Sequence, residues 1–343
     1  MTKKQPVLEL KGVGRSFGGL VAVNSVDLEV AAGSITSIIG PNGAGKTTLF
    51  NVISGIYAPT KGNITLSGAL LATPDHKTER EAIIWGAMSV AGIVLGAIAG
   101  LAIDAPAGLA GAGAIVSTGA ILLAAVARPS WYVRLCASFG IQRSARPNDV
   151  VFLGIARTFQ NIRLFKEMSA LENVMVGTHS RTKVGLFDAL LDTRRFRHTE
   201  KESESQALTL LTAVGLEQHA NVAAKNLAYG DQRRLEVARA LASTPKLLLL
   251  DEPAAGMNPA ESAELLAQFR QIMKQANAGM LLIDHDVTLI RSACDSLTVL
   301  DHGRVIAQGD PETILSLPEV HAAYLGWGEE SSVDEKTTTN NER

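Results

Sequence analysis

Cysteine and net charge are both scarce in this sequence. The 343 residues include two cysteines, Cys136 and Cys294, which cannot form a disulfide framework, so we expect a reducing compartment. The formal net charge of -2 excludes the strongly basic surface that nucleic-acid binding requires, and we expect no nucleic-acid partner. No apolar signal region follows the first residues, so a cleavable signal peptide is not expected.

Short strand patterns alternate with helical patterns over most of the chain. Alternating apolar and polar residues predict half-buried strands, short apolar runs predict buried strands, and amphipathic stretches predict helices. The half-buried strands are expected at 7–10, 26–30 and 63–67, the buried strands at 34–39, 155–159, 247–250 and 280–283, and the helices at 47–54, 203–214, 231–242 and 259–275. This order predicts an α/β fold around a mostly parallel sheet, with a small antiparallel layer beside it.

One glycine-rich run fits the phosphate-binding pattern G-x-x-x-x-G-K-[ST]. It reads Gly40-Pro41-Asn42-Gly43-Ala44-Gly45-Lys46-Thr47 and continues with Thr48. The glycines let backbone N–H groups turn inward around a phosphate, Lys46 neutralises β- and γ-phosphate charge, and Thr47 offers a hydroxyl to Mg²⁺. The predicted helix directs its N-terminus at the same anion. An ordinary glycine-rich turn is the weaker alternative, because a strand precedes the run and a helix follows it.

Two acidic residues end one of the predicted buried strands. Asp251 follows 247–250 directly, and Glu252 comes next. We expect this strand to lie beside the strand that leads into the phosphate loop. Asp251 would then hold Mg²⁺ through water, and Glu252 would polarise the attacking water. The alternative is a strand that simply ends in solvated acids, and the phosphate loop upstream disfavours it.

Two further polar residues follow buried strands. His285 comes after 280–283, where an imidazole is suited to contact a γ-phosphate and orient water, although a lone histidine is more often structural. Gln160 comes after 155–159 and is a neutral candidate for sensing both the metal and the water. Either interpretation alone is weak.

These motifs together resemble the ATPase family of ABC transporters, and six elements occur in the family's order. Residues 40–48 resemble the Walker A loop, Gln160 the Q-loop glutamine, 227–232 the signature, 247–252 the Walker B strand, 255–258 the D-loop and His285 the switch histidine. Phe17 stands where the family places an aromatic ring that stacks on adenine. Outside 83–148 and the tail, the resemblance covers nearly the whole chain.

The sequence departs from the broad family at two motifs. Ala228 and Tyr229 stand where the signature usually has serine and glycine, and Asn258 stands where the D-loop usually has aspartate. The lost serine hydroxyl removes one γ-phosphate donor, whereas Gly230 and the N–H groups at the start of the helix remain able to bind phosphate. We therefore retain Ala228, Gly230 and Asp231 as candidate nucleotide contacts at the signature. The runs LAYGDQRRLEVAR, ARTFQNIRLF and PAAGMNP resemble the LivG-type ATPases of branched-chain amino acid uptake.

The resemblance implies a P-loop NTPase fold of ABC type, with a RecA-like core, an antiparallel β layer and a helical subdomain. It implies ATP and Mg²⁺ as ligands, and a second ATPase subunit, identical or different, that closes head to tail with ATP between the phosphate loop of one subunit and the signature of the other. It further implies two transmembrane permeases, a periplasmic binding protein that acts indirectly, and a place at the cytoplasmic face of the inner membrane.

The implied cargo is a branched-chain amino acid. Another polar solute, such as an amide or urea, is an alternative, because phosphate-loop residues do not read the cargo. A non-transport ABC ATPase is disfavoured by the single phosphate loop, the lack of long coiled-coil heptads and the lack of a basic stripe. A small-molecule kinase with the same loop leaves residues 227–232 and His285 unexplained.

One segment departs strongly from the family. Residues 83–103 and 105–127 carry no charge, and each run is long enough for a membrane-crossing helix of roughly 20 residues. Gly92, Gly96 and Gly100 predict a smooth helix face, and basic and aromatic residues flank the outer ends. We expect an inserted helical hairpin at 76–148 that enters the membrane at 83–127. The alternative is a pair of Ala- and Gly-rich helices packed on this protein or on a partner. The ATPase domain is expected at 1–75 and 149–328, and a disordered tail at 329–343.

Overall fold

The computed structural model describes residues 6–72, 74, 145, 147–179, 188 and 190–325. Residues Met1–Thr73 and Ala145–Arg343 form one compact unit, and Pro74–Ser144 form another. Every helix and strand given below belongs to the first unit. The uncharged runs 83–103 and 105–127 and the tail 329–343 lie outside the described residues. Among the helices within those described ranges, none is both long and apolar enough to cross a membrane.

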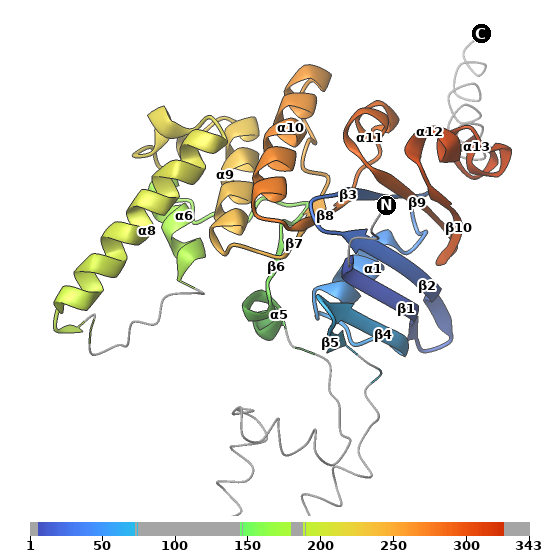
Figure 1. Cartoon of the computed structure of the whole chain (residues 1–343). Coiled ribbons are helices and arrows are strands. Elements are labelled where there is room, and N and C mark those ends of the chain that lie inside the picture. The colour runs from blue at the N-terminus through green and yellow to red at the C-terminus, as the bar shows by residue number, and fades with distance from the viewer. Residues whose placement is uncertain are drawn as a thin grey trace, which may run out of the picture. The chain divides into compact units, whose positions relative to one another are not determined.

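Two β-sheets form the scaffold (Figure 1). The four-stranded sheet is antiparallel and has the order β2 (Leu20–Ala31), β1 (Pro6–Phe17), β4 (Lys61–Leu66) and β5 (Ala69–Ala72). The six-stranded sheet has the order β10 (Arg304–Gly309), β9 (Ser296–Asp301), β3 (Ile35–Ile39), β8 (Gly279–Ile283), β7 (Leu247–Asp251) and β6 (Ile155–Arg157). Its strands are parallel except for β10, which pairs antiparallel with β9. The predicted α/β fold and antiparallel layer are therefore confirmed.

The six-stranded sheet is buried on both faces, which explains the uninterrupted apolar runs of its central strands. In β7, Leu247 and Leu249 join the core shared with helix α1 (Lys46–Ile53) and the four-stranded sheet. Leu248 and Leu250 point the other way, into the core that also contains Leu265 and Phe269 of helix α10 (Pro259–Gln275). All four leucines are fully buried. The sheet therefore places the end of each parallel strand at one edge, between two packed layers.

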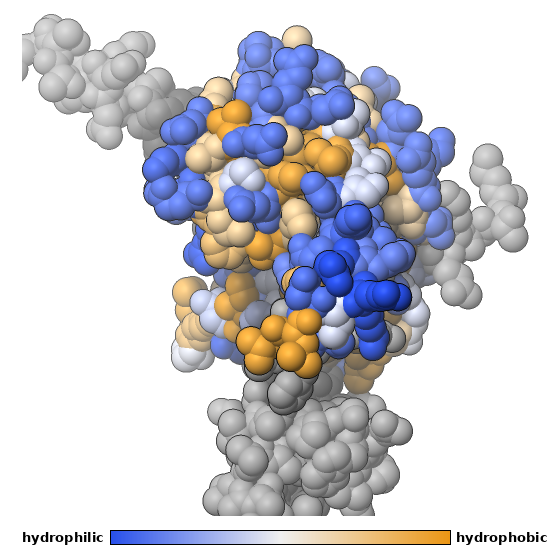
Figure 2. Space-filling view, turned by 90° about the vertical axis from the view of Figure 1, so that its left-hand side faces the viewer, coloured by the Kyte–Doolittle hydropathy of each residue, from blue (hydrophilic) through white to orange (hydrophobic). Residues whose placement is uncertain are grey.

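Nine α-helices lie within the described ranges. They are α1 (Lys46–Ile53), α5 (Pro147–Leu153), α6 (Ala170–Thr178), α8 (Arg194–Ala213), α9 (Tyr229–Ala242), α10 (Pro259–Gln275), α11 (Val287–Ala293), α12 (Pro311–Leu315) and α13 (Pro318–Leu325), with short 3-10 turns at Glu217–His219 and Ala224–Asn226. Helices α6, α8 and α9 pack on one another as a helical subdomain (Figure 1). Seen from that side, apolar surface alternates with hydrophilic surface (Figure 2).

Local side-chain caps define where two of these helices begin. Ser169 caps α6 by accepting from the Glu172 N–H, and the Glu172 carboxylate accepts from the Ser169 N–H in return. Asn258 and Glu261 form the same reciprocal capping box at the start of α10. Each box satisfies N–H groups that a helix start leaves unpaired. The start of α10 therefore coincides with the predicted 259.

The strand order corrects one sequence-based expectation. The strand that ends in Asp251, β7, was expected beside the strand that leads into the phosphate loop, β3. The neighbour of β3 on that side is β8, and β7 lies one strand further away. Chain order alone does not set the order of parallel strands, because each is joined to the next by a helix that can cross over another strand. Asp251 still pairs in register with Ile283 of β8, so all three strands end at the same edge.

Several element boundaries also differ from the sequence-based ranges. Strands β1 and β2 extend well beyond 7–10 and 26–30, because they pair along a long twisted hairpin with several bulges. Helix α8 begins nine residues before the predicted 203, where Thr193 caps it. Strand β6 ends at Arg157 rather than at 159, because the next residues turn away toward α9.

The two ends of the segment 73–144 meet in the described structure. The Ala145 N–H donates to the Leu71 carbonyl at 3.0 Å, so the chain returns to the place from which it leaves β5. Helix α5 follows directly and exposes the side chains of Val151, Phe152 and Leu153, with Phe152 72% exposed. The described part of the fold therefore continues from β5 to α5 through the backbone hydrogen bond between Ala145 and Leu71.

Candidate nucleotide site

The glycine-rich loop joins β3 to α1 in a conformation that only glycine tolerates at two of its positions. Gly40 has φ 151°, and an added Cβ would lie 2.0 Å from the Leu300 carbonyl oxygen. Gly45 has φ 97°, and an added Cβ would lie 2.3 Å from the Ala22 carbonyl oxygen. Both positive φ values and both close approaches exclude a side chain. The loop is therefore pressed against β9 and β2, and helix α1 begins at Lys46.

Lys46 is held by the loop that it follows. Its ammonium donates to the carbonyl oxygens of Gly40 at 2.6 Å and Pro41 at 2.9 Å. Burial lowers the pKa of Lys46, whereas the nearby carboxylates of Glu252 and Asp251 act in the opposite direction. Because Lys46 bonds to neutral carbonyls and forms no ion pair in the described structure, its ammonium is available to attract an anion.

Asp251 forms the acidic wall of the site and is buried at the end of β7. Its carboxylate lies 3.4 Å from the Arg157 guanidinium, which also donates to Asn51 at 2.7 Å and Ser54 at 2.9 Å. Burial raises the pKa of the Asp251 carboxyl, and the Arg157 charge opposes that rise. Because Asn51 lies in α1, Arg157 fixes β7 relative to the helix that starts at the phosphate loop.

Glu252, Gln160 and His285 come together from three different strand ends. The Gln160 amide donates to a Glu252 carboxylate oxygen at 3.2 Å. The His285 Nδ1 lies 3.8 Å from the other Glu252 oxygen, and its ring is 76% exposed. Glu252 itself has φ 49°, which is unusual for a residue with a side chain and is typical of functional positions. The carboxylate is therefore oriented by two polar neighbours.

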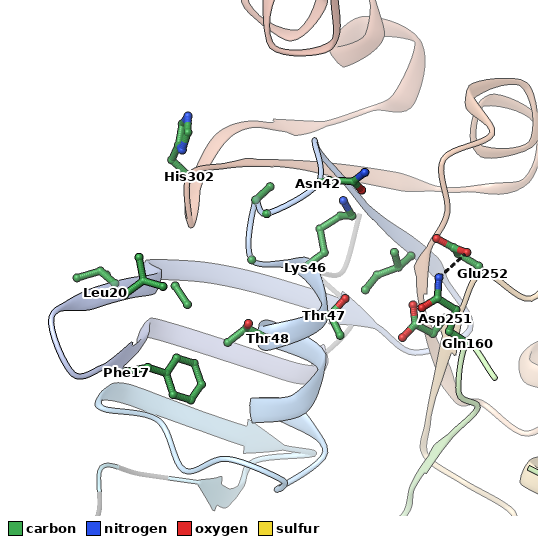
Figure 3. A pocket seen from close by; sticks show the side chains of 16 residues that line it. Phe17, Leu20, Asn42, Lys46, Thr47, Thr48, Gln160, Asp251, Glu252 and His302 are labelled. Atoms are coloured by element: carbon green, nitrogen blue, oxygen red, sulfur yellow. Dashed lines mark hydrogen bonds between the residues drawn. The ribbon is translucent and has the colours of Figure 1, made fainter. Parts of the chain in front are cut away.

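Lys46, Asp251, Glu252 and Gln160 line one cavity of about 560 Å³, whereas His285 is not among its lining residues and reaches the site only through its contact with Glu252. Phe17 lies at one end, Asp251, Glu252 and Gln160 lie at the other, and Lys46, Thr47 and Thr48 lie between them (Figure 3). Asn42, Gly43, Ala44 and Gly45 also line the cavity, whereas Gly40 and Pro41 do not line it and bond to Lys46 through their carbonyls. The cavity is elongated between an aromatic ring and a cluster of carboxylates, with a cation in the middle.

Phe17 is supported as a stacking surface. Its ring meets Tyr57 edge to face, with the centroids 5.1 Å apart, and the Arg15 guanidinium lies 4.5 Å from its centroid. The ring is 38% exposed, so one part of it remains open toward the cavity. This arrangement suits a flat heterocycle placed against the free part of the ring.

The signature candidates Ala228, Gly230 and Asp231 lie away from this cavity, at the N-terminal end of α9. Ala228 is the N-cap residue and gives no side-chain cap, so the first N–H groups of α9 have no partner from that side chain. Such a helix start attracts an anion. These residues are therefore not brought to the phosphate loop of the same chain.

Several residues of the site were not predicted from the sequence. Leu20, Val21 and Ala22 of β2, Ile283 of β8 and His302 between β9 and β10 also line the cavity. Arg157 was overlooked as the partner of Asp251, although an arginine inside a predicted buried strand was a usable signal, since buried charges are normally paired. His302 gave no comparable signal, because the turn that carries it reaches the site only through tertiary packing of Gly303 on Ala44.

Comparison with known proteins identifies the class. The family model described as ABC transporter matches residues 23–87 and 147–255. The chain belongs to this family, and it is similar to the family's ATP-binding proteins over nearly its whole length. The family match leaves out residues 88–146, which include most of the uncharged runs.

Two curated relatives are similar over almost their full length. The high-affinity branched-chain amino acid transport ATP-binding protein LivG of Salmonella typhimurium is 38% identical over 322 residues, which cover 94% of this chain and 98% of the relative. The corresponding protein BraF of Pseudomonas aeruginosa is 36% identical over 323 residues, with 94% and 98% covered.

Solved structures show the same fold. The ADP conformation of an ATP-binding cassette of an ABC transporter has a TM-score of 0.64 and 22% identity, and the match covers 94% of this chain and 100% of that chain. A dimeric post-hydrolysis state of another ATP-binding cassette, bound to ADP and phosphate, has a TM-score of 0.56 and 19% identity, and covers 89% of this chain and 98% of that chain. The predicted ABC-type ATPase fold is thus confirmed.

Proposed function

We propose that this chain binds and hydrolyses ATP to drive the import of branched-chain amino acids across the inner membrane. The observation that carries the proposal is the single cavity in which the phosphate loop, the Asp251–Glu252 pair and the Phe17 ring meet. The cargo is proposed from LivG and BraF, because both are named for branched-chain amino acid transport.

The shape of the cavity supports one orientation of the nucleotide. Adenine would lie on Phe17, and the triphosphate would follow the loop toward Asp251. The backbone N–H groups of the loop and the start of α1 would bind the β-phosphate. Lys46 would then exchange its carbonyl partners for β- and γ-phosphate oxygens, which are stronger acceptors because they are charged.

The residues at the acidic end fit a magnesium ion. Thr47, Gln160 and Asp251 offer a hydroxyl, an amide oxygen and a carboxylate on one side of the cavity, and Mg²⁺ prefers a few such oxygens combined with water and phosphate. When bound, Mg²⁺ would neutralise charge on the phosphates. The ion pair with Arg157 favours the charged form of the Asp251 carboxyl and so opposes the rise in its pKa that burial causes.

Glu252 is proposed to polarise the water that attacks the γ-phosphate. Among the described residues its carboxylate forms no ion pair with a lysine or arginine, unlike that of Asp251, and Gln160 and His285 approach its two oxygens. Gln160 would orient Glu252 and the water, and His285 would contact the γ-phosphate. By accepting a proton from the attacking water, Glu252 would make the water oxygen a stronger nucleophile.

A second ATPase subunit, identical or different, is proposed to complete each site. Ala228, Gly230 and Asp231 lie at an exposed helix start of this chain, outside its own cavity. The N–H groups there would bind the γ-phosphate of ATP held by the partner. Two transmembrane permeases would be moved by closure of this pair, and a periplasmic binding protein would deliver the cargo to them.

The proposed place of action is the cytoplasmic face of the inner membrane. The uncharged runs within 83–127 support a hairpin in the membrane, because each has the length and composition of a membrane helix.

The test of the hydrolytic role is the substitution Glu252→Gln. It removes the base and keeps the size of the side chain, so turnover should fall by roughly 10²- to 10⁴-fold while ATP still binds. Binding of a fluorescent ATP analogue and release of phosphate measure the two effects separately. Glu264→Gln, an exposed change on α10, is the matched control. Wild-type turnover in Glu252→Gln would remove Glu252 from the proposed role.

The cargo is tested by reconstituting this chain in lipid vesicles with candidate permeases and a periplasmic binding protein for branched-chain amino acids. ATP turnover of the assembled transporter should rise with leucine, isoleucine or valine and should not respond to urea or an aliphatic amide. Stimulation by urea or an amide alone would replace the proposed cargo and leave the ATPase role intact.

A further inference from the structure

Helix α9 carries a buried ion pair that the proposed catalytic mechanism does not use. Arg233 and Glu236 are 3% and 2% exposed, and their charged groups lie 3.5 Å apart. Neither residue lines the nucleotide cavity. Burying both charges removes their hydration, so such a pair adds little or no net stability. Its presence therefore calls for a role other than stability.

The pair forms hydrogen bonds with the backbone of the segment 159–163. The Arg233 guanidinium donates to the Phe159 carbonyl at 2.9 Å and also to the Gln160 carbonyl. The Glu236 carboxylate accepts from the Arg163 N–H at 3.3 Å. The segment is thus held at both of its ends by two side chains that neighbour each other on α9.

The same segment carries Gln160 to Glu252. With its backbone fixed by Arg233, the Gln160 side chain reaches the Glu252 carboxylate at 3.2 Å. A short loop that bonds only to water would leave the Gln160 amide free to turn away. The buried pair therefore restricts where the amide can lie.

On the side away from Glu252, the contacts of Arg233 reach an exposed residue at the start of α9. The Tyr229 hydroxyl lies 3.0 Å from the Arg233 guanidinium, and Tyr229 is the first residue of α9 and 50% exposed. Its ring also covers Gly256, where an added Cβ would lie 3.0 Å from a ring carbon. The contacts thus run from the surface of α9, through Arg233 and Gln160, to Glu252.

We propose that Arg233 and Glu236 are positioning residues for ATP hydrolysis, which hold Gln160 against Glu252 and transmit displacements of the N-terminal end of α9 to that carboxylate. The inference rests on the proposed function, because it requires that Glu252 act on the attacking water. In the proposed pair of subunits, the start of α9 faces ATP held by the partner. Occupancy of one site would therefore adjust the catalytic carboxylate of the other.

The informative variant removes both charges at once. A single substitution leaves one buried charge without its partner, which is strongly destabilising and would obscure a positional effect. The double variant Arg233→Met with Glu236→Leu replaces the pair by apolar side chains of similar size, a change that is often neutral for stability. Arg270→Met is the matched control, because Arg270 also pairs with an acid and a carbonyl, Asp295 and Ala293, away from the cavity.

Three measurements on the full chain test the proposal. Amide exchange of residues 159–163 should accelerate by at least about 10-fold in the double variant, because the segment loses its buried partners. ATP turnover should fall by about 10- to 100-fold, as expected for a displaced catalytic group. ATP affinity should change by less than about twofold, because the displaced Gln160 affects the transition state of hydrolysis and not the binding of ATP. The control should leave all three values unchanged.

A double-mutant comparison separates positioning from a general structural effect. Gln160→Ala should lower turnover in the wild-type background and add almost nothing in the double variant, because both changes act through one contact. The proposal would be overturned if Gln160→Ala lowered turnover by the same factor in both backgrounds. It would also be overturned if the amides of 159–163 exchanged faster in the double variant while its ATP turnover stayed at the wild-type value. A failure of the proposed function would give a different result. Glu252→Gln would then keep wild-type ATP turnover, regardless of how fast the backbone amides of 159–163 exchange.

Discussion

At the scale of single residues, two partly buried cations serve the cavity in different ways. Arg157 is committed to three partners, Asn51, Ser54 and Asp251, and so fixes the geometry of the acidic wall. Lys46 bonds only to backbone carbonyls of its own loop. A carbonyl is a weaker acceptor than a phosphate oxygen, so Lys46 can change partners when a nucleotide enters. The first cation organises the protein, and the second is available to a ligand.

Removal of the Lys46 ammonium should therefore weaken nucleotide binding. We expect Lys46→Ala to lower ATP affinity by about 10- to 100-fold, since a hydrogen bond to a charged group contributes roughly 1.5–3 kcal/mol. Equilibrium binding of a fluorescent ATP analogue measures the change. Lys274→Ala, an exposed change on α10, should bind like the wild type. Undiminished affinity in Lys46→Ala would contradict the proposed nucleotide site itself, provided that thermal unfolding shows both variants to be folded.

At the scale of elements, Asn258 explains how the chain tolerates its departure at the D-loop. Asn258 is the N-cap of α10: its side-chain oxygen accepts from the Glu261 N–H at 2.9 Å, and the Glu261 carboxylate accepts in return from the Asn258 N–H. Aspartate and asparagine cap a helix about equally well. The asparagine therefore preserves the local fold that an aspartate would give.

The cap predicts opposite results for two substitutions. Asn258→Ala should lower the free energy of unfolding by about 1 kcal/mol, because the Glu261 N–H loses its partner. Asn258→Asp should retain or slightly increase stability, since a negative charge favours a helix N-terminus by roughly 0.3–1 kcal/mol. Urea unfolding followed by circular dichroism gives both values. Equal stability of the alanine and aspartate variants would show that the capping box contributes nothing measurable.

At the scale of the whole molecule, the insertion is proposed to be a separate unit inside a continuous ATPase domain. The chain leaves after Ala72 at the end of β5, and the Ala145 N–H bonds to the Leu71 carbonyl on its return. The ATPase domain, 1–75 and 149–328, therefore needs no length of chain between these points. This division remains a proposal, as does the membrane hairpin.

Deletion of the insertion tests both proposals. Replacement of 74–144 by a short Gly-Ser link should leave ATP binding within about twofold, because the ends already meet and a shorter closed loop costs less entropy. The full chain, expressed without permeases, should float with lipid vesicles, and the deletion variant should remain with the unbound protein. A deletion variant that does not fold would contradict the domain division. Equal flotation of both proteins would contradict the membrane hairpin.

The sequence was sufficient to predict the motifs that consist of neighbouring residues. The phosphate loop from Gly40 to Thr47 is contiguous, and the spacing of its glycines and lysine is enough to predict phosphate binding. The buried strands were equally clear, because a sheet covered on both faces requires uninterrupted apolar runs such as 247–250. Boundaries were less clear where long strands pair through bulges, as in β1 and β2, since bulges interrupt the alternation on which the prediction rests.

Residues that meet across the chain were harder to predict. His302 enters the cavity only because Gly303 bonds to Ala44, and Arg157 meets Asp251 only because β6 pairs with β7. The position of β8 between β3 and β7 also escaped the sequence, because crossover helices allow more than one strand order. Such contacts join residues that are far apart in the sequence, 94 positions for Arg157 and Asp251, and no local pattern encodes them.

The amino-acid sequence by itself therefore determined the class of this protein and its local chemistry: a phosphate loop, two acids after an apolar strand, and a helix that begins at the signature. Each depends on short-range periodicity or on spacing within a few residues. Tertiary structure alone decided that the acids face the loop across an intervening strand, that Arg157 neutralises one of them, and that Arg233 and Glu236 hold Gln160 to the other. These outcomes depend on which distant surfaces are buried together, and burial is a property of the whole fold.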